Sequence, residues 1–473
     1  MKKLLLLTSA LLLSPVLHSV EKPNLIVIMT DDMGYADVGF NGCEDIPTPH
    51  IDSIASKGVK FSSGYTSYSV CGPSRAGFIT GRYQQRFGFE RNPLWSLTDP
   101  KSALPLSEMT IGQSLQKVGY KTAIIGKWHL GAEPSLRPNK RGFDEFFGHL
   151  GGGHKFMPED LNIVKTEDVK NESDSYRSWI TRNDTPVRTE KYLTEEFSDE
   201  AVSFVEGNKD KPFFLFLSYN APHLPLQATQ KYLDRFDHIS DPKRKVYAAM
   251  VSAVDDGVGQ IMAKLHKLKI EDNTIVFFLS DNGGPTTKNH SDNGPLKGSK
   301  SDIWEGGYRV PFAMQYTGVV KGGQVYDHPV SSLDIFATIA DISQSPIHKD
   351  KPLDGVNLVP YVTGENTAAP HEQLYLRKFD QSRYAVRQGD YKLVIPWKGA
   401  PPQLYNLSKD IGETKNIAMN HPERVQEINM LRKAWDKELM DPIFLGLTSS
   451  PAWKAKVARE KAKKAAALKK QNK

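Results

Sequence analysis

The chain has little cysteine, no internal repeat and only one apolar run that approaches the length of a membrane span. Its only cysteines are Cys43 and Cys71, so at most one disulfide can form within the chain. The Leu-rich run at residues 4–17 is shorter than the roughly 20 residues that a transmembrane helix needs. The sequence therefore excludes a disulfide-rich scaffold and predicts no membrane anchor.

A basic surface is also missing, although the formal net charge is +6. The Lys/Ala-rich tail at residues 454–473 contributes +8 and Lys2 and Lys3 contribute +2, which leaves −4 for residues 20–453. A body with this charge does not favour a nucleic-acid partner. We interpret the tail as a solvated helix or a frayed end, with a docking arm for a polyanion as the alternative.

The first 19 residues have the pattern of a secretory signal. Lys2 and Lys3 precede the Leu-rich run, and the small residue Ser19 follows it. We therefore predict a signal peptide at residues 1–19 and a periplasmic or secreted protein. In an exported protein the two cysteines would ordinarily be read as a disulfide between Cys43 and Cys71.

Short apolar runs that alternate with helical patterns predict an α/β fold, with a mostly parallel sheet flanked by helices. Continuous apolar runs, as expected for strands buried on both faces, occur at residues 24–30, 120–126, 212–218 and 273–280. A further strand is expected at 59–65, and helices at 48–58, 110–118, 241–267 and 332–342. These elements define one large domain at residues 20–360.

The pattern of predicted secondary structure changes after residue 360. A β-hairpin is expected at residues 383–395 and an amphipathic helix at 419–439. We interpret residues 361–453 as a small C-terminal α+β subdomain. Within the large domain, the polar stretch at 151–194 has no regular period and is expected to be an irregular functional or mobile insert.

Polar side chains follow four of the predicted strands. Because the carboxyl ends of parallel strands lie along one edge of a sheet, these residues are expected to meet in space. A single pair of Asp residues after a strand is more often a turn or a helix cap, so only the whole set together indicates a site. The set is Asp31, Asp32, Lys127, His129, His223, Asp281 and Asn282.

The pentapeptide Cys71-Gly72-Pro73-Ser74-Arg75 predicts a loop that enters a short helix. Pro73 suits the first turn of a helix and Gly81 suits the position after its end. Cys71 would then lie at the positive end of the helix dipole, where anions bind. The alternative for an isolated cysteine is a buried structural role.

This pentapeptide resembles the C-x-P-S-R signature of the type I sulfatases, in which the cysteine is oxidised to formylglycine. Several distant segments also resemble that family, and together they cover most of residues 23–360: Asn24–Asp32, Gly126–Gly131, Pro222–His223, Ser280–Gly284, Lys297–Gly298 and Glu305–Pro311. The sequence as a whole resembles those of polysaccharide sulfatases of marine bacteria, including those acting on carrageenan-type galactans. The resemblance implies an alkaline-phosphatase-like fold and a sulfuric ester hydrolase.

The resemblance also implies a metal site and a maturation step. Asp31, Asp32, Asp281 and Asn282, with an oxygen of residue 71, look like the ligands of one divalent cation. Oxygen ligands with three carboxylates favour Ca²⁺, with Mg²⁺ as the runner-up. A formylglycine-generating enzyme would convert Cys71, which would make the disulfide impossible and leave Cys43 as a lone thiol.

Catalytic roles follow from the same resemblance. Arg75 and Lys127 look like the charges that stabilise the aldehyde hydrate and the transition state. His129 resembles the base that expels sulfate from residue 71 and regenerates the aldehyde. Lys297 and His223 look positioned on the sulfate, and His223 is the candidate acid for the leaving alcohol.

The substrate expected from export and from this resemblance is a sulfated polysaccharide or its oligosaccharides. Residues His154, Arg177 and Trp179 of the insert are candidate substrate contacts, because aromatic and Arg side chains suit sugars and sulfates. Ordinary solvated loop positions are the alternative for these residues.

Two other functions compete with this reading. One is a phosphonate or phosphate ester hydrolase of the same fold, against which the Cys71 pentapeptide and the Lys127-Trp128-His129 segment argue. The other is a catalytically inactive sulfated-glycan-binding protein, against which the presence of every catalytic residue type argues.

Overall fold

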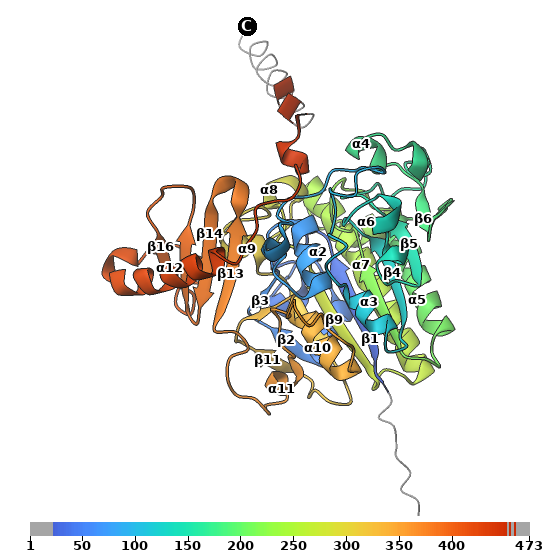
Figure 1. Cartoon of the computed structure of the whole chain (residues 1–473). Coiled ribbons are helices and arrows are strands. Elements are labelled where there is room, and N and C mark those ends of the chain that lie inside the picture. The colour runs from blue at the N-terminus through green and yellow to red at the C-terminus, as the bar shows by residue number, and fades with distance from the viewer. Residues whose placement is uncertain (1–21, 452–453, 456–457, 460–473) are drawn as a thin grey trace, which may run out of the picture.

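The computed structural model describes residues 22–451, 454–455 and 458–459. Figure 1 shows a large body built on one twisted sheet, with a smaller sheet and its helix against one side. The predicted signal peptide lies outside the described residues, as does most of the Lys/Ala-rich tail. Among the described residues, no helix is both long enough and apolar enough to cross a membrane.

The large body is organised on a sheet that has ten strands within the described residues. Its order is β11 (Gln324–Tyr326), β2 (Val59–Phe61), β10 (Phe312–Gln315), β9 (Thr274–Ser280), β1 (Asn24–Thr30), β8 (Phe213–Ser218), β4 (Lys121–Lys127), β5 (Glu145–His149), β6 (Ile180–Arg182) and β7 (Thr185–Val187). The central strands β9, β1, β8, β4 and β5 are parallel to their neighbours within this group. β10, β6 and β7 pair antiparallel. The predicted mostly parallel sheet is confirmed.

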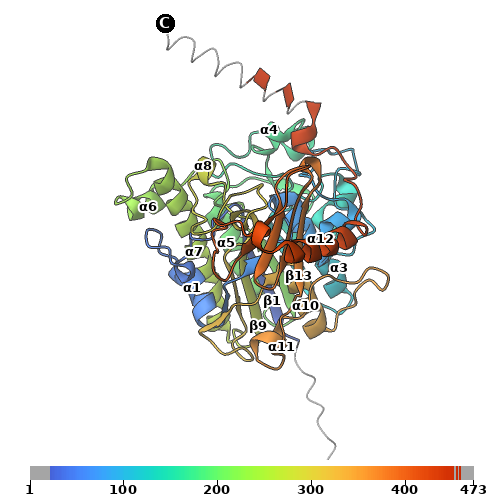
Figure 2. The same cartoon turned by 90° about the vertical axis from the view of Figure 1, so that its left-hand side faces the viewer.

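Helices cover both faces of the sheet, as the continuous apolar strands require. Ile26 and Ile28 of β1 belong to the apolar layer that also contains residues of α1 (Pro49–Ser56), α5 (Leu193–Gly207) and α7 (Pro242–Leu268). Leu25 and Val27 belong to the opposite layer, with residues of α2 (Cys71–Thr80), α3 (Ile111–Gln116) and α10 (Asp334–Ser343). Figures 1 and 2 show this three-layer arrangement.

Two sequence predictions for this body need correction. The strand expected at 59–65 is divided into β2 and β3 (Gly64–Tyr65), and β3 pairs with β12 (Val330–Ser331) in a separate two-stranded sheet. The insert at 151–194 is not wholly irregular, because it contains α4 (Glu172–Ser175) and the β6–β7 hairpin that extends the main sheet. Short helices complete the body: α6 (Gln230–Leu233), α8 (Thr286–Asn289), α9 (Glu305–Tyr308) and α11 (Val359–Val362).

The C-terminal subdomain is an antiparallel sheet covered by one helix. Its strands are β13 (Gln373–Lys378), β14 (Arg383–Gln388), β15 (Tyr391–Ile395) and β16 (Gln403–Asn406). Ile428 of α12 (Pro422–Asp436) packs with Val386, Leu393 and Leu404 of the sheet. The α+β subdomain is thus confirmed, with two more strands than the expected hairpin, whereas the limits at 360 and 453 stay predictions.

Buried charges join the subdomain to the large body. Lys392 of β15 lies 2.9 Å from Glu305 and 2.8 Å from Glu413, and none of these three side chains is exposed to solvent. The Glu305 carboxylate also accepts hydrogen bonds from Tyr65 and, at 3.2 Å, from Arg309. We call this group, Tyr65, Glu305, Arg309, Lys392 and Glu413, the junction cluster.

Candidate active site

Four neighbouring strands deliver the predicted polar residues to one edge of the sheet. β9, β1, β8 and β4 lie side by side, and their carboxyl ends are followed by or contain Asp281, Asp31, the turn to His223, and Lys127. The expected convergence of these strand ends is therefore seen. Asp32 and His129 have positive φ angles of 67° and 59°, a left-handed conformation that non-glycine residues adopt chiefly where the surrounding structure or function demands it.

Cys71 is the first residue of α2 and is buried at this edge. Gly81, with a φ of 64°, ends the helix as the sequence predicts. The Lys300 ammonium lies 3.1 Å from the Cys71 Sγ. Burial raises the pKa of the Cys71 thiol to about 11, although Lys127 and Lys300 act to lower it. The unmodified side chain is therefore a protonated thiol near neutral pH and a poor nucleophile.

Three buried carboxylates surround Cys71, and each is paired with one basic side chain. The pairs are Asp281 Oδ2 with Arg75 Nε at 2.8 Å, Asp31 Oδ2 with Lys127 Nζ at 2.6 Å, and Asp32 Oδ1 with Lys300 Nζ at 2.6 Å. Arg75 also donates hydrogen bonds to the Ser218 hydroxyl and to the Lys127 carbonyl oxygen. We call these residues together with Cys71 the reaction centre. It places three positive groups where an anion could be bound.

The carboxylates of the reaction centre differ in their pKa values. Burial and the neighbouring Asp31 carboxylate together raise the pKa of Asp281 to about 6, against the opposing effect of Arg75 and Lys127. Burial would also raise the pKa of Asp32, but Lys300 and His223 outweigh it and bring the value to about 2. Asp32 therefore keeps a full negative charge across the physiological range.

The acceptor atoms of this centre fit a divalent cation. Asp31, Asp32, Cys71 and His223 offer ligand atoms that lie within 4.8 Å of one another. Asp31 Oδ1 and Asn282 Oδ1 are buried and have no hydrogen-bond partner among the described residues. Buried oxygens without partners are rare, and a hard cation would satisfy them. Asp281 is not in this group; its oxygens accept from Arg75 and from the Asp32 N–H, at 2.8 and 3.3 Å.

Two histidines face the reaction centre. The His223 Nδ1 lies 2.7 Å from the Leu224 carbonyl oxygen, and its Nε2 lies 3.5 Å from Asp32 Oδ2. Burial lowers the pKa of His223 to about 4 against the opposing effect of Asp32. Burial and the positive charge of Lys127 hold the pKa of His129 well below its usual value. Both imidazoles are therefore neutral near pH 7 in the substrate-free protein.

The structure corrects the position expected for Lys297. Its ammonium lies 3.1 Å from the Glu413 carbonyl oxygen and 3.7 Å from the centre of the Trp304 ring, beside the junction cluster. Lys300, three residues later, reaches Asp32 and Cys71 instead. Both lysines belong to the same loop before Glu305. The sequence indicated a basic residue on this loop but could not show which of the two reaches Cys71.

His154 of the insert also needs correction as a substrate contact. It is fully buried, with its ring nitrogens 3.0 Å from the Lys155 carbonyl oxygen and 2.9 Å from the Ser178 carbonyl oxygen. Its side chain therefore holds the insert together. Arg177 is partly exposed and pairs with Asp174 at 3.1 Å, and Trp179 is half-buried, so their contacts with substrate stay predictions.

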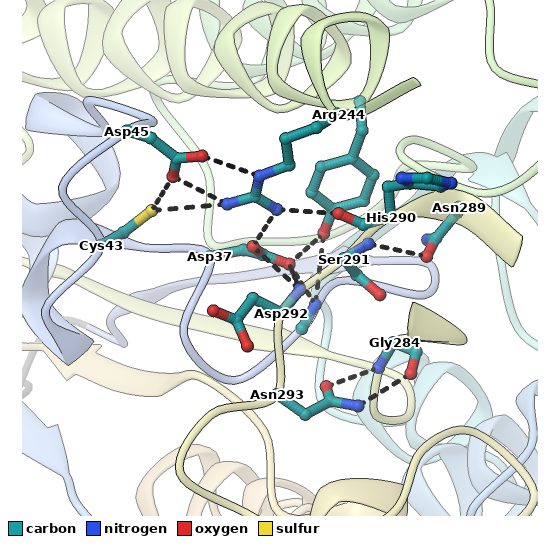
Figure 3. A network of polar contacts seen from close by, with 12 residues as sticks. Asp37, Cys43, Asp45, Arg244, Gly284, Asn289, His290, Ser291, Asp292 and Asn293 are labelled. Atoms are coloured by element: carbon teal, nitrogen blue, oxygen red, sulfur yellow. Dashed lines mark hydrogen bonds and ion pairs between the residues drawn. The ribbon is translucent and has the colours of Figure 1, made fainter. Parts of the chain in front are cut away.

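A network of polar contacts ties together the segments that follow β1 and β9 (Figure 3). Arg244 of α7 lies 2.6 Å from Asp37 and 2.8 Å from Asp45, in the segment after β1. Asp37 accepts a hydrogen bond from the Asp292 N–H, which follows β9. Cys43 lies in the same network, 3.3 Å from Asp45, and both cysteines are free, as expected for a chain without the Cys43–Cys71 bridge.

Comparison with known proteins gives a consistent result. The sulfatase family model matches residues 23–345, and the model of the N-sulphoglucosamine sulphohydrolase C-terminal region matches residues 299–440. The chain is 30% identical to the uncharacterized sulfatase YdeN of Escherichia coli (strain K12), over 86% of this chain and 84% of that protein. It is 34% identical to the N-acetylgalactosamine-6-sulfatase of Mus musculus, over 76% and 69%.

A solved structure extends the similarity to the whole fold. The crystal structure of Ps i-CgsB in complex with k-i-k-neocarrahexaose matches with a TM-score of 0.84 and 37% identity, over 89% of this chain and 94% of that chain. The alkaline-phosphatase-like sulfatase fold predicted from the sequence is thus confirmed, and Cys71 occupies the position of the family's formylglycine. The chain belongs to the sulfatase family and is a sulfuric ester hydrolase.

Proposed function

We propose that this sulfatase hydrolyses sulfate esters of a sulfated polysaccharide of the carrageenan type, or of its oligosaccharides. The observation that carries the proposal is the convergence of Cys71, three carboxylates and three basic side chains in a chain with 37% identity to Ps i-CgsB. The neocarrahexaose bound to that relative supports a sulfated galactan as the substrate class.

Residue 71 supplies the nucleophile in this proposal. A maturation enzyme oxidises Cys71 to formylglycine, and one hydroxyl of its hydrate attacks the sulfur atom. The Lys300 ammonium, 3.1 Å from the Cys71 Sγ, lies where it can bind an oxygen of the sulfate. Arg75 and Lys127 fix the carboxylates around the nucleophile and stabilise the negative charge that develops in the transition state.

The two histidines divide the proton transfers. His223, whose Nε2 lies 3.5 Å from Asp32 Oδ2, is proposed to protonate the leaving alcohol. Its pKa of about 4 in the free protein must rise for this role, and an anionic sulfate ester beside it would raise it. His129, neutral and buried, is proposed to accept the proton of the second hydroxyl of residue 71, which expels sulfate and regenerates the aldehyde.

Asp31, Asp32 and Asn282, with an oxygen of residue 71, would hold the divalent cation. Asp281 would either complete this set or orient Arg75. Bound there, the cation would neutralise charge on the sulfate and favour ionisation of the attacking hydroxyl. Ca²⁺ is the proposed ion and Mg²⁺ the runner-up, because carboxylate and amide oxygens suit both.

We also propose that the protein is exported to the periplasm or secreted. The supporting feature is the signal pattern at residues 1–19. The maturation enzyme would then act on the chain before it folds, since Cys71 is buried in the folded structure.

A turnover assay with matched substrates tests the proposed activity. We expect the wild-type protein, produced with a maturation enzyme, to hydrolyse both an aryl sulfate and sulfated carrageenan oligosaccharides. Activity on the matching aryl phosphonate should be much lower. A Cys71→Ala protein should be inactive on all of them. Preferred turnover of the phosphonate would support the phosphonate hydrolase instead, and binding of oligosaccharide without any turnover would support the glycan-binding alternative.

A further inference from the structure

Tyr176, which immediately follows α4 in the insert, lies beside the proposed acid. Its ring centre is 6.5 Å from that of His223, with the two rings tilted by 49°. The Tyr176 carbonyl accepts a hydrogen bond of 2.9 Å from the Lys155 N–H, which fixes the backbone at this point. The insert therefore delivers an aromatic side chain to the side of the centre where His223 lies.

The phenol is surrounded by charges of the reaction centre. Burial raises the pKa of Tyr176, and the charged groups that act on its hydroxyl are Glu172, Lys300 and Asp31. The hydroxyl nevertheless makes no hydrogen bond to any part of the chain that the structure describes. Tyrosine hydroxyls at largely buried positions usually find a partner, so the phenol is available for a ligand.

Gly153 allows the phenol to occupy this position. A Cβ atom on Gly153 would lie 2.5 Å from both Cζ and Oη of Tyr176, well inside contact distance. The backbone of the insert therefore passes directly against the phenol end, and a side chain larger than glycine would displace it. Gly153 and Tyr176 therefore shape this part of the site together. No periodic pattern in the sequence indicates that the two residues are in contact.

We propose that Tyr176 is a specificity-determining residue that contacts the sugar ring carrying the sulfate. Its ring packs beside that sugar and its hydroxyl donates a hydrogen bond to a neighbouring sugar hydroxyl, which orients the ester oxygen toward His223. This inference rests on the proposed function, because it takes the leaving group beside His223 to be a sugar. A small aryl sulfate has no such hydroxyl and gains less from the contact.

Kinetics on two substrates test this role. We compare wild type, Tyr176→Phe and Gly153→Ala on a sulfated carrageenan oligosaccharide and on an aryl sulfate. Loss of one hydrogen bond should lower the ratio of the two kcat/KM values, oligosaccharide over aryl sulfate, by about 2- to 13-fold in Tyr176→Phe. Gly153→Ala keeps the hydroxyl but displaces it, so its ratio should fall at least as far. Thermal unfolding confirms that both variants are folded.

Tyr361→Phe serves as the matched control. Tyr361 lies on α11, and its hydroxyl likewise has no hydrogen-bond partner within the described part of the chain, so the variant loses the same group far from the centre. Its ratio should stay at the wild-type value. An unchanged ratio in Tyr176→Phe and Gly153→Ala would overturn the inference while leaving the proposed function intact. A wild-type protein that hydrolyses the aryl sulfate but no sulfated oligosaccharide would overturn both.

Discussion

The reaction centre and the junction cluster are both buried groups of charges assembled from distant parts of the chain. In the junction cluster, both oxygens of Glu305 have partners within the protein, from Lys392 on one side and Tyr65 and Arg309 on the other. In the reaction centre, Asp31 Oδ1, Asn282 Oδ1 and Arg75 Nη2 are buried without a partner among the described residues.

This difference separates a structural charge cluster from a functional one. Burial of charge is common to both, and each cluster contains strongly shifted pKa values: Glu305 reaches about 2, because Lys392 and Arg309 outweigh the effect of burial. In the junction cluster, Glu413 Oε1 makes no hydrogen bond but is still held by the Lys392 ammonium at 2.8 Å, whereas Asp31 Oδ1 and Asn282 Oδ1 of the strand ends have no cation beside them among the described residues. Open polar atoms, rather than burial or a shifted pKa, therefore mark the site that binds a cation and an anion.

Breaking the junction cluster should have the largest effect on stability. Lys392→Met would leave Glu305 and Glu413 buried without their shared cation, and the free energy of unfolding should fall by about 3–5 kcal/mol. Denaturant unfolding measures this loss. Lys231→Met, which breaks the exposed Lys231–Glu195 pair, is the control and should cost less than about 1 kcal/mol. An equally small loss in Lys392→Met would show that the junction cluster is not structural.

Substitutions of two lysines on one loop test which of them belongs to the reaction centre. Lys300→Ala removes the ammonium beside Cys71 and should lower kcat/KM on an aryl sulfate by about 10²- to 10³-fold, or about 2.7–4 kcal/mol. Lys297→Ala removes a contact with Glu413 and Trp304 and should keep most of the activity. The reverse order of losses would restore the catalytic role first expected for Lys297.

Cation binding should distinguish the clusters by thermal unfolding. After chelation, Ca²⁺ at about 100 times its Kd should stabilise the wild-type protein by about 2.7 kcal/mol. Asp31→Asn should lose this response, whereas Lys392→Met should keep it from a lower starting stability. A parallel titration with Mg²⁺ decides between the two ions, and an unchanged response in Asp31→Asn would remove Asp31 from the metal site.

The smallest effect concerns a pH-dependent pair outside both clusters, His371 and Asp334. His371 Nε2 lies 2.8 Å from Asp334, and this carboxylate raises the pKa of His371 although burial opposes it. The pair should stabilise the protein fully below the unfolded-state pKa of about 6.5, and the contribution should disappear as pH rises through the higher folded-state pKa. Tm measured across this window should fall more in wild type than in His371→Gln. Parallel curves would contradict the pairing.

The sequence predicted the features that depend on local pattern. The buried strands β1, β8 and β9 are continuous apolar runs, and their order in a parallel sheet brings Asp31, Asp32 and Asp281 to one edge. The helix at Cys71 was predictable because Pro73 and Gly81 mark its two ends. These predictions required no knowledge of contacts between distant side chains.

The remaining features depend on contacts that no local pattern records. Lys300 rather than Lys297 faces Cys71 because of the path of an irregular loop, in which Gly298 has a φ of 83°. His154 resembled a surface residue but is buried against carbonyl oxygens of the insert. Tyr176 reaches the centre only because Gly153 passes beside its phenol.

The central claim is that residue 71, held among the open polar atoms of the reaction centre, acts as formylglycine. The most direct test measures peptide mass at residue 71 and turnover of an aryl sulfate in preparations made with and without a maturation enzyme. We predict that kcat per enzyme molecule rises in proportion to the formylglycine fraction and extrapolates to zero without it. A preparation that contains only cysteine at residue 71 and is equally active would contradict the account.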